Sequence, residues 1–518
     1  MNQITCLETL PDEIILQTCS YLRGIDVLYS FYNLNRRLNI TITGYCRYIN
    51  LLAVTHNQFE HVASKILPNI GYAAFSFVLH ASWETIMSEK AFQILFCSPI
   101  SLVFPHIQRI ILKWFSGERL FTFMDNLNDL SQLIQLDIRG LRGIIPKKLL
   151  TKIFSLNHCQ LKSISFDDDS VDLVLLDDDE LDCYPNLEEL RIDAKSCRML
   201  EILLKALPNL RCFHISISEH LLSSTPKQLL LASITSHHLV DFELRSIAAF
   251  WTLDEIIDLL HRMPSLKKLA LDICTKDDRF LKKDHLDTCL PKSLTEFYFF
   301  IRYYYLDKNF PIDTLLDSWP THIPVAFWDD RSKYCASIHS IPYGLRSLIL
   351  SATLDTKTKH VPIRVPWLKK LDVYGKCDLF YLLDAAPALD RLLIQYDCLK
   401  LQLNEKRTCD LLRQRIVRLH ISDWIDSKSD LLEQLAFVFT SLYELVLSIK
   451  DSQIFVNELA SRILFLWHNQ SLFSLYINGQ LADDAKENLR QWFIDHTNLT
   501  TNSSFAVKYN ENWLDLWI

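Results

Sequence analysis

One hydrophobic pattern returns along most of the chain. It consists of an apolar anchor, two variable residues, a second anchor, one variable residue and a third anchor, as in LEELRI at 187–192. Such alternation is the period-two signature of a strand that buries one face. We therefore predict a strand in each of fourteen segments: 107–112, 133–138, 161–166, 187–192, 210–215, 239–244, 266–271, 294–299, 345–350, 368–373, 389–394, 416–421, 442–447 and 472–477.

The spacing of these segments distinguishes them from chance apolar runs. Successive starts are 21 to 30 residues apart, except for one interval of 51 between 294 and 345. This interval is close to two periods and predicts one degenerate unit around HIPVAFW at 322–328. Proline, which ends helices and favours extended backbone, stands two residues before the first anchor in five units. These prolines are Pro185, Pro208, Pro264, Pro366 and Pro387.

Between the strands, several segments carry helical patterning. In WTLDEIIDLLHRM at 251–263, Thr252 and Glu255 have the spacing of a capping box, and apolar residues follow at helical spacing. A strand, a turn, a helix and a turn at this period predict an α/β solenoid, with parallel strands inside and helices outside.

The repeated L-x-x-L-x-L segment resembles the leucine-rich repeat family, and the resemblance covers roughly residues 104–480. In that family an Asn or Cys follows three residues after the third anchor. Here that residue is present as Cys274, whereas Lys195, Lys376 and Asp397 occupy the equivalent place elsewhere. This departure predicts an irregular repeat geometry.

The first fifty residues lack the repeated triple and are predicted to form three short helices. Pro11 fits a first helical turn, where Asp12 and Glu13 favour the positive end of the helix dipole. Asn35 can cap the third helix. Periodicity allows two interpretations: a helical cap on the solenoid, or a docking element for a separate protein.

LETLPDEIILQTCSYLRGIDVLYSFYNLNRRLNITI at 7–42 resembles an F-box, which docks on the small adaptor of a cullin-RING ubiquitin ligase. It departs from the family in having Leu38-Asn39-Ile40 where an aromatic residue is usual near the end of the third helix. Leu38 also matches the motif. The resemblance implies adaptor binding by Leu7, Leu10, Pro11, Ile14, Ile15, Leu22, Leu28 and Phe31.

An F-box followed by leucine-rich repeats implies a non-catalytic substrate receptor of an SCF-type ubiquitin ligase. The expected divisions are an F-box at 1–50, a connector and cap at 51–103, repeats at 104–480 and a C-terminal cap at 481–518. The alternative is a repeat scaffold for protein interactions without a ligase connection.

Residues between the anchors are predicted to point out from the strand face, where a target protein would bind. Tyr298 and Phe300 are large aromatics at such positions, beside the irregular interval, and an exposed aromatic pair with nearby cations is typical of an interface hot spot. The alternative is that the irregular segment folds back and buries both rings. The predicted target-binding residues are Arg245, Tyr298, Phe300, Lys370 and Tyr374.

Composition argues against other classes of function. The net charge is −8 without a basic block, which argues against nucleic-acid binding. Prolines break the charge-free stretches 66–83 and 91–108, so we expect no membrane span. Fourteen scattered cysteines without a C-x-x-C motif or signal peptide predict reduced thiols, in the cytoplasm or nucleus. Nine glycines are too widely spaced for a nucleotide loop, and neither a catalytic motif nor metal-ligand spacing occurs, so we predict no enzyme, cofactor or metal.

Overall fold

The computed structural model describes residues 10–518 apart from 52–53, 55, 81–99, 142, 144, 147, 157–159, 168–169, 171–180, 219–234, 283–284, 287–289, 306–324, 331–334, 341–346, 351–364, 367, 375–378, 426–428, 452, 468–471, 501–504 and 511. The fold divides into two compact units. The first comprises Met1–Ala249, Ile257–Lys268 and Pro291–Thr295, and the second comprises Phe250–Ile256, Leu269–Leu290 and Glu296–Ile518.

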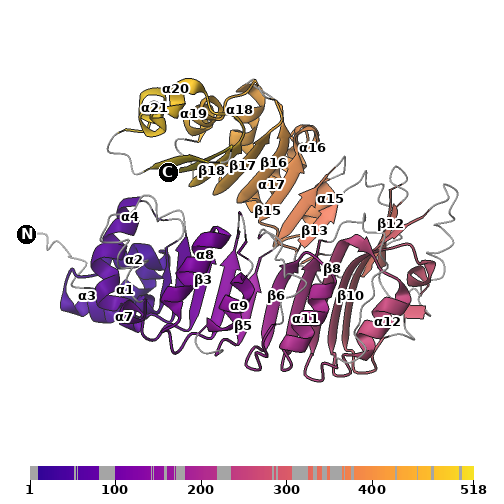
Figure 1. The fold of residues 1–518 in the computed structure, drawn as a ribbon. Helices are drawn as coiled ribbons and strands as arrows, with labels where there is room; N and C mark the ends of the chain where they lie inside the picture. Colours follow the sequence, from indigo (N-terminus) through magenta and orange to yellow (C-terminus); the bar gives the residue numbers. More distant parts are fainter. Residues whose placement is uncertain are drawn as a thin grey trace, which may run out of the picture. The chain divides into compact units, whose positions relative to one another are not determined.

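The larger of two β-sheets in the described residues has twelve strands and is mostly parallel (Figure 1). Its order, β1-β2-β3-β4-β5-β6-β7-β8-β9-β10-β12-β11, follows the chain up to β10. Each neighbouring pair from β1 to β8 is parallel. The strands are β1 Tyr48–Asn50, β2 Ser76–His80, β3 Arg109–Lys113, β4 Gln135–Arg139, β5 Ser163–Phe166, β6 Glu189–Ala194, β7 Cys212–Ile217, β8 Asp241–Phe250, β9 Lys268–Thr275, β10 Glu296–Tyr304, β11 Val325–Asp330 and β12 Cys335–Ser340.

The second sheet has eight strands, and its order is β13-β14-β15-β16-β17-β18-β20-β19. The pairs from β13 to β18 are parallel, whereas β20 runs antiparallel to both β18 and β19. A C-terminal hairpin therefore ends the parallel series. The strands are β13 Ser347–Leu350, β14 Lys370–Val373, β15 Arg391–Gln395, β16 Arg418–Trp424, β17 Glu444–Ile449, β18 Ser474–Asn478, β19 Ala506–Asn510 and β20 Trp513–Trp517.

All fourteen predicted strands are confirmed, and each begins two residues after the first anchor of its triple. The segment LEELRI shows why: Leu187, Leu190 and Ile192 are buried, while Glu189 and Arg191 lie on the other face of the strand. Burial of the anchors sets both the start and the register of each strand.

Two features of the sheets differ from the sequence prediction. Strands β1 and β2 precede the first triple and extend the parallel series before residue 104. The predicted degenerate unit at 322–328 is wrong, because β11 pairs antiparallel with β12, and β12 pairs antiparallel with β10. Four residues separate β11 from β12, too few for the crossover of a dozen or more residues that parallel strands require.

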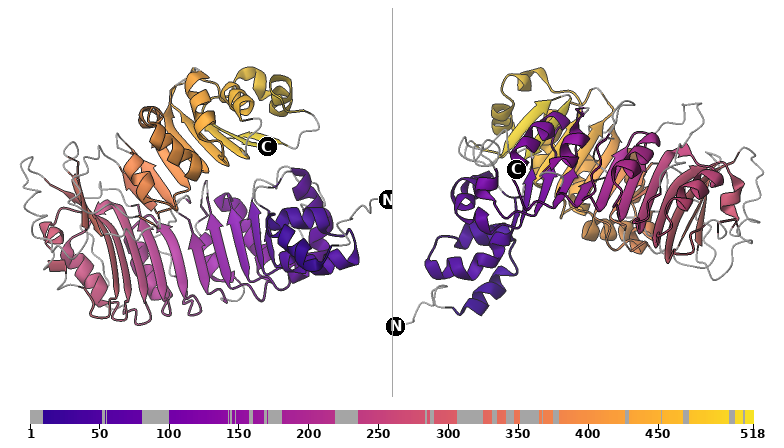
Figure 2. Two further views of the ribbon diagram at one scale, coloured as in Figure 1. Left: turned by 180° about the vertical axis from the view of Figure 1, so that it is seen from behind. Right: turned by 60° about the horizontal axis from the view of Figure 1, so that its bottom comes forward.

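Helices connect many successive strands, and α8, α9 and α11 lie along one face of the strands in the first unit (Figures 1 and 2). The predicted capping box at α12 is confirmed: Glu255 Oε2 accepts from the amide of Thr252 at 2.7 Å, and Thr252 Oγ1 accepts from the amide of Glu255 at 3.3 Å. The helices between strands of the two sheets include α8 Gly117–Phe123, α9 Leu149–Phe154, α11 Arg198–Ala206, α12 Leu253–His261, α15 Leu379–Ala385, α16 Tyr396–Gln402, α17 Lys406–Arg415, α18 Ser429–Val438 and α19 Val456–Leu466.

The remaining helices lie near the ends of the chain or are single turns. Their bounds are α1 Asp12–Cys19, α2 Gly24–Phe31, α3 Arg36–Thr41, η2 Ile42–Arg47, α4 His56–His61, η3 Val62–Ile66, α5 Leu67–Ile70, η4 Gly71–Ala73, α7 Ile100–Val103, η7 Met124–Leu127, η9 Asp278–Leu281, α20 Asp483–Lys486 and α21 Leu489–His496. A search of the described residues found no helix with the length and apolar character needed to cross a membrane.

Candidate functional site

Three short helices, α1, α2 and α3, form at the N-terminus as the sequence predicts (Figure 1). The carbonyl of Pro11 accepts from the amides of Ile14 and Ile15, which begins α1. Asn35 caps α3, because its Oδ1 accepts from the amide of Leu38 at 2.8 Å. Arg37 on α3 pairs with Asp12 at 2.7 Å and so ties α3 to the start of α1.

The predicted adaptor-binding residues divide into a buried group and an exposed group. Ile15 and Leu28 are each 1% exposed and belong to the core of the helical segment. Ile14 and Leu22 are 43% and 42% exposed, Pro11 is exposed, and Leu10 and Phe31 are half-buried. Leu7 lies outside the described residues. Ile14 and Leu22 are exposed enough to contact a partner directly, whereas Ile15 and Leu28 pack inside the helical segment.

Sequence reasoning missed several apolar side chains that the same helices leave on the surface. Tyr21, Leu34 and Ile40 are 83%, 58% and 67% exposed. Tyr21 follows α1, Leu34 precedes α3 and Ile40 lies on α3, so a search for the core face of each helix passes over them. Large apolar side chains exposed in one short segment favour an interaction site.

The predicted exposure of Phe300 is wrong, because its side chain is 1% exposed and belongs to the hydrophobic core of the second unit. His339, its register partner on β12, stacks on the ring with 5.7 Å between centroids, and the Arg302 guanidinium lies 4.4 Å from the ring centroid. Tyr298 is half-buried and packs against the same core. Phe300 is therefore buried in the core of the second unit, as the alternative interpretation of the sequence anticipated.

The three other predicted target-binding residues do not flank β10. Arg245 lies on β8, two strands from β10 in the sheet order, and Lys370 lies on β14 of the other sheet. Tyr374 follows β14 and is 37% exposed, while Lys370 Nζ lies 3.8 Å from Asp372 Oδ2. The prediction that Arg245 and Lys370 occupy strands next to Phe300 is therefore wrong, because the 51-residue interval starts a new sheet.

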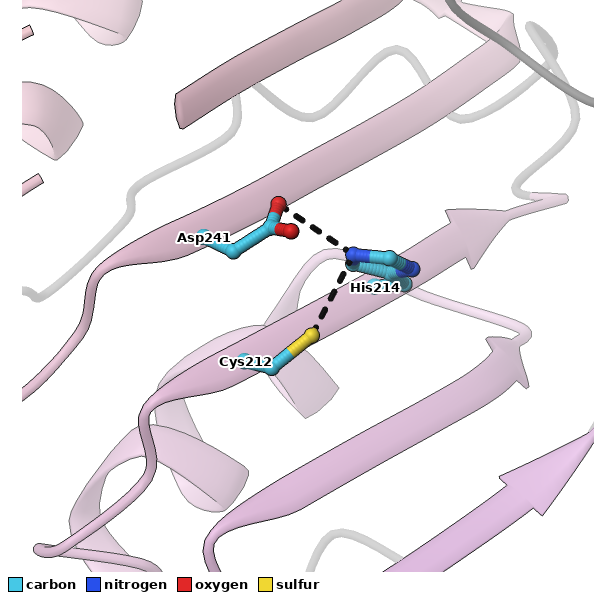
Figure 3. Close-up of side chains that lie close together, drawn as sticks. All are labelled: Cys212, His214 and Asp241. Atoms are coloured by element: carbon cyan, nitrogen blue, oxygen red, sulfur yellow. Dashed lines mark hydrogen bonds and ion pairs between the residues drawn. The ribbon is translucent and has the colours of Figure 1, made fainter. Parts of the chain in front are cut away.

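A cluster that the sequence did not predict lies on β7 and β8 (Figure 3). Cys212 and His214, two residues apart on β7, share one face, and the parallel register places Asp241 beside Cys212 and Glu243 beside His214. His214 Nε2 lies 3.4 Å from Cys212 Sγ and 3.3 Å from Asp241 Oδ1.

Two further charged groups surround this cluster. Glu243 Oε2 lies 3.5 Å from His214 Nδ1, and Lys268 Nζ donates to Asp241 Oδ2 at 3.0 Å. The side chains of His214 and Asp241 are 21% and 25% exposed. Each nitrogen of the imidazole therefore faces an acid in a partly desolvated setting.

The charges in this cluster determine the ionisation of its members. Burial alone would lower the pKa of His214, but hydrogen bonds with Asp241 and Cys212 and the charge of Glu243 outweigh it and raise that pKa to about 10. Burial opposes ionisation of Asp241 as well, yet His214 and Lys268 hold its pKa below the usual range. Near neutral pH His214 is therefore an imidazolium that pairs with the Asp241 carboxylate.

The cluster was missed because each triple was read alone. Asp241, Glu243 and Lys268 were assigned to the outward strand face, but the same positions in LRCFHI are Cys212 and His214. Aligning LRCFHI, LVDFEL and LKKLAL by their anchors puts Cys212 beside Asp241 and Asp241 beside Lys268. Because β7 and β8 pair in parallel without a register shift, residues at equivalent positions of the two triples lie side by side in the sheet.

No protein-family model matches this chain, and no curated protein matches its sequence. The structure defines an α/β protein whose larger sheet is mostly parallel, with helices between strands. The candidate sites therefore rest on their own geometry.

Proposed function

We propose that this protein is a non-catalytic substrate receptor. Its N-terminal helices would bind the adaptor of an SCF-type ubiquitin ligase as an F-box does, and its repeated strands, as a leucine-rich-repeat solenoid, would bind a target protein. The observation that carries the proposal is the division of apolar residues in α1 to α3 between a closed core and a large exposed set.

This division supports a docking role in energetic terms. Ile15, Leu28 and Leu38 are each 1% exposed, so the helices already have a core without their exposed side chains. Fully burying one Ile or Leu contributes about 1.5–3 kcal/mol. Ile14 and Leu34, at 43% and 58% exposure, leave part of that free energy available to a partner.

A binding assay between the full chain and the purified ligase adaptor tests the proposal. The substitutions Ile14→Glu and Leu34→Glu place charges on the exposed surface without opening the core. We expect the double variant to bind the adaptor roughly 100-fold more weakly, which is about 2.7 kcal/mol. The double substitution Leu10→Ala with Pro11→Ala, at the matched F-box opening, is likewise expected to abolish adaptor co-purification.

Phe437→Glu is the matched control, because Phe437 lies on α18 in the second unit and is 71% exposed. This variant should bind the adaptor like the unmodified chain, and circular dichroism should show that every variant keeps its secondary structure. Adaptor binding that survives both double substitutions at full affinity would refute the F-box assignment.

The contact between α2 and β1 favours a second candidate function. A helical segment packed on the first strand of the sheet would serve as a cap on a repeat scaffold without a ligase connection. Under this alternative the unmodified chain does not bind the adaptor at all, and the Glu substitutions change neither binding nor stability.

A further inference from the structure

The cluster on β7 and β8 combines a thiol, an imidazole and a carboxylate at short range. Cys212 Sγ, His214 Nε2 and an oxygen of Asp241 all lie within 4.8 Å of one another. Figure 3 shows the three side chains converging, with dashed lines from one imidazole nitrogen to the sulfur and to the carboxylate. Adjacent hydrogen-bonded strands hold this arrangement, because the positions of all three Cα atoms follow from the parallel register.

Two of the three separations between these atoms fit tetrahedral metal coordination. Zinc binds sulfur at about 2.3 Å and nitrogen or oxygen at about 2.0–2.2 Å, so two ligand atoms at a tetrahedral angle are about 3.3–3.6 Å apart. His214 Nε2 lies 3.4 Å from the sulfur and 3.3 Å from Asp241 Oδ1. These two separations match those between neighbouring ligand atoms of one tetrahedral zinc ion.

The surrounding groups match the outer shell of a metal site. A metal-binding imidazole ordinarily donates its second N–H to a carboxylate, which fixes the ring orientation. Glu243 Oε2, 3.5 Å from Nδ1 of His214, is placed for this role. Lys268 engages Oδ2 of Asp241 at 3.0 Å and leaves Oδ1 on the side of the imidazole.

From this geometry we propose that Cys212, His214 and Asp241 form a zinc-binding site with three protein ligands and a fourth position for water. The donor set identifies the metal class, since a thiolate and an imidazole favour zinc over the oxygen-seeking calcium and magnesium ions. Zinc binding would release the proton of the His214 imidazolium. The resulting thiolate, neutral imidazole and carboxylate carry a formal charge of about −2, which a divalent ion balances. Glu243 and Lys268 then neutralise each other. This site does not depend on the proposed ligase connection.

Cobalt(II) titration of the reduced, metal-free full chain tests the site. Tetrahedral cobalt with a thiolate ligand gives a near-ultraviolet charge-transfer band and visible d–d bands. We expect both to saturate at one cobalt per chain and to disappear when zinc is added. The near-isosteric variants Cys212→Ser and Asp241→Asn, together with His214→Gln, should lose the bands while keeping the circular dichroism spectrum of the unmodified chain.

Two controls are matched to the ligands by residue type. Cys183 and His238 are exposed and outside the cluster, so Cys183→Ser and His238→Asn should retain the bands and the affinity. Glu243→Gln removes no ligand and should weaken binding about 10- to 100-fold, as is usual for the outer partner of a metal-bound histidine.

Several results would overturn the site. One is the absence of a thiolate band in the unmodified chain, which would identify the cluster as a hydrogen-bonded network alone. Another is a band that persists in Cys212→Ser or vanishes in Cys183→Ser, since either places the metal elsewhere. An unchanged affinity in Glu243→Gln would contradict the role assigned to that carboxylate. Adaptor binding is measured separately and does not enter these outcomes.

Discussion

Lowering the pH from 7 to 5 should destabilise the second unit through one buried histidine. His339 on β12 is 1% exposed and stacks on the ring of Phe300, and its Nδ1 lies 2.9 Å from the backbone oxygen of Ser340. The Arg302 guanidinium lies 4.4 Å from the centroid of the same ring. Burial, partly offset by the hydrogen bond to Ser340, lowers the pKa of His339 from its ordinary 6.5 to about 4.

The sign and size of the effect follow from these two pKa values. Below pH 6.5 the unfolded chain binds a proton at His339 that the folded protein excludes until about pH 4. The stabilising contribution is therefore fully present above pH 6.5 and is lost as the pH falls towards 4. One pKa unit corresponds to about 1.36 kcal/mol, so the 1.5 units between 6.5 and 5 amount to about 2 kcal/mol.

Urea unfolding at pH 7 and pH 5, followed by circular dichroism, measures this loss. Many carboxylates also respond to pH, so the informative quantity is the difference between the unmodified chain and His339→Gln, which is uncharged at both values. We expect the unmodified chain to lose about 2 kcal/mol more than the variant. Equal losses in the two proteins would show that His339 is accessible to protons, and would refute the buried Phe300–His339 stack.

Two further predictions concern a buried ion pair and a glycine that packs against a tryptophan ring. Asp272 is fully buried and paired with Arg302, so Asp272→Ala should cost about 3–5 kcal/mol in urea unfolding. The double variant with Arg302→Met should be more stable than Asp272→Ala, and equal stability would contradict the importance of the pair. Gly140 has φ +62°, and a Cβ there would lie 2.7 Å from the Trp114 ring. Gly140→Ala should therefore cost about 2–4 kcal/mol, whereas Gly44→Ala, which meets no atom within 4 Å, should change the melting temperature little.

Hydrophobic periodicity was sufficient to predict the strands and their faces within the repeats. Burying Leu190 and Ile192 requires one strand phase, because a shift by one residue would expose both anchors. These outcomes depend on local pattern and need no knowledge of neighbouring segments.

Pattern within one strand could not show whether another part of the chain covers its outward face. Alternation assigned Asp272 and Phe300 to that face, and both are buried. The run FYFFIRYYY at 297–305 contained a signal, since a nearly continuous apolar stretch is typical of a strand buried on both sides. The hydrophobic pattern could not predict the direction of β12, because this direction depends on the length of the connection to β11 and on pairing with β10.

The zinc-site proposal depends on a different property of the repeats, namely the register between them. Cys212 and His214 are separated from Asp241 by 29 and 27 residues, so no motif search with short spacing brings them together. Because successive strands pair in parallel at a nearly constant period, residues about one period apart in the sequence lie next to each other in the sheet. Residues at equivalent positions of consecutive triples therefore become neighbours, and each outward column can combine side chains from three or more repeats. Because the anchors fix the register, substitutions at the variable positions that remain exposed change the chemistry of a column at little cost to the fold. The exposed columns are therefore where such a sheet can acquire a binding site.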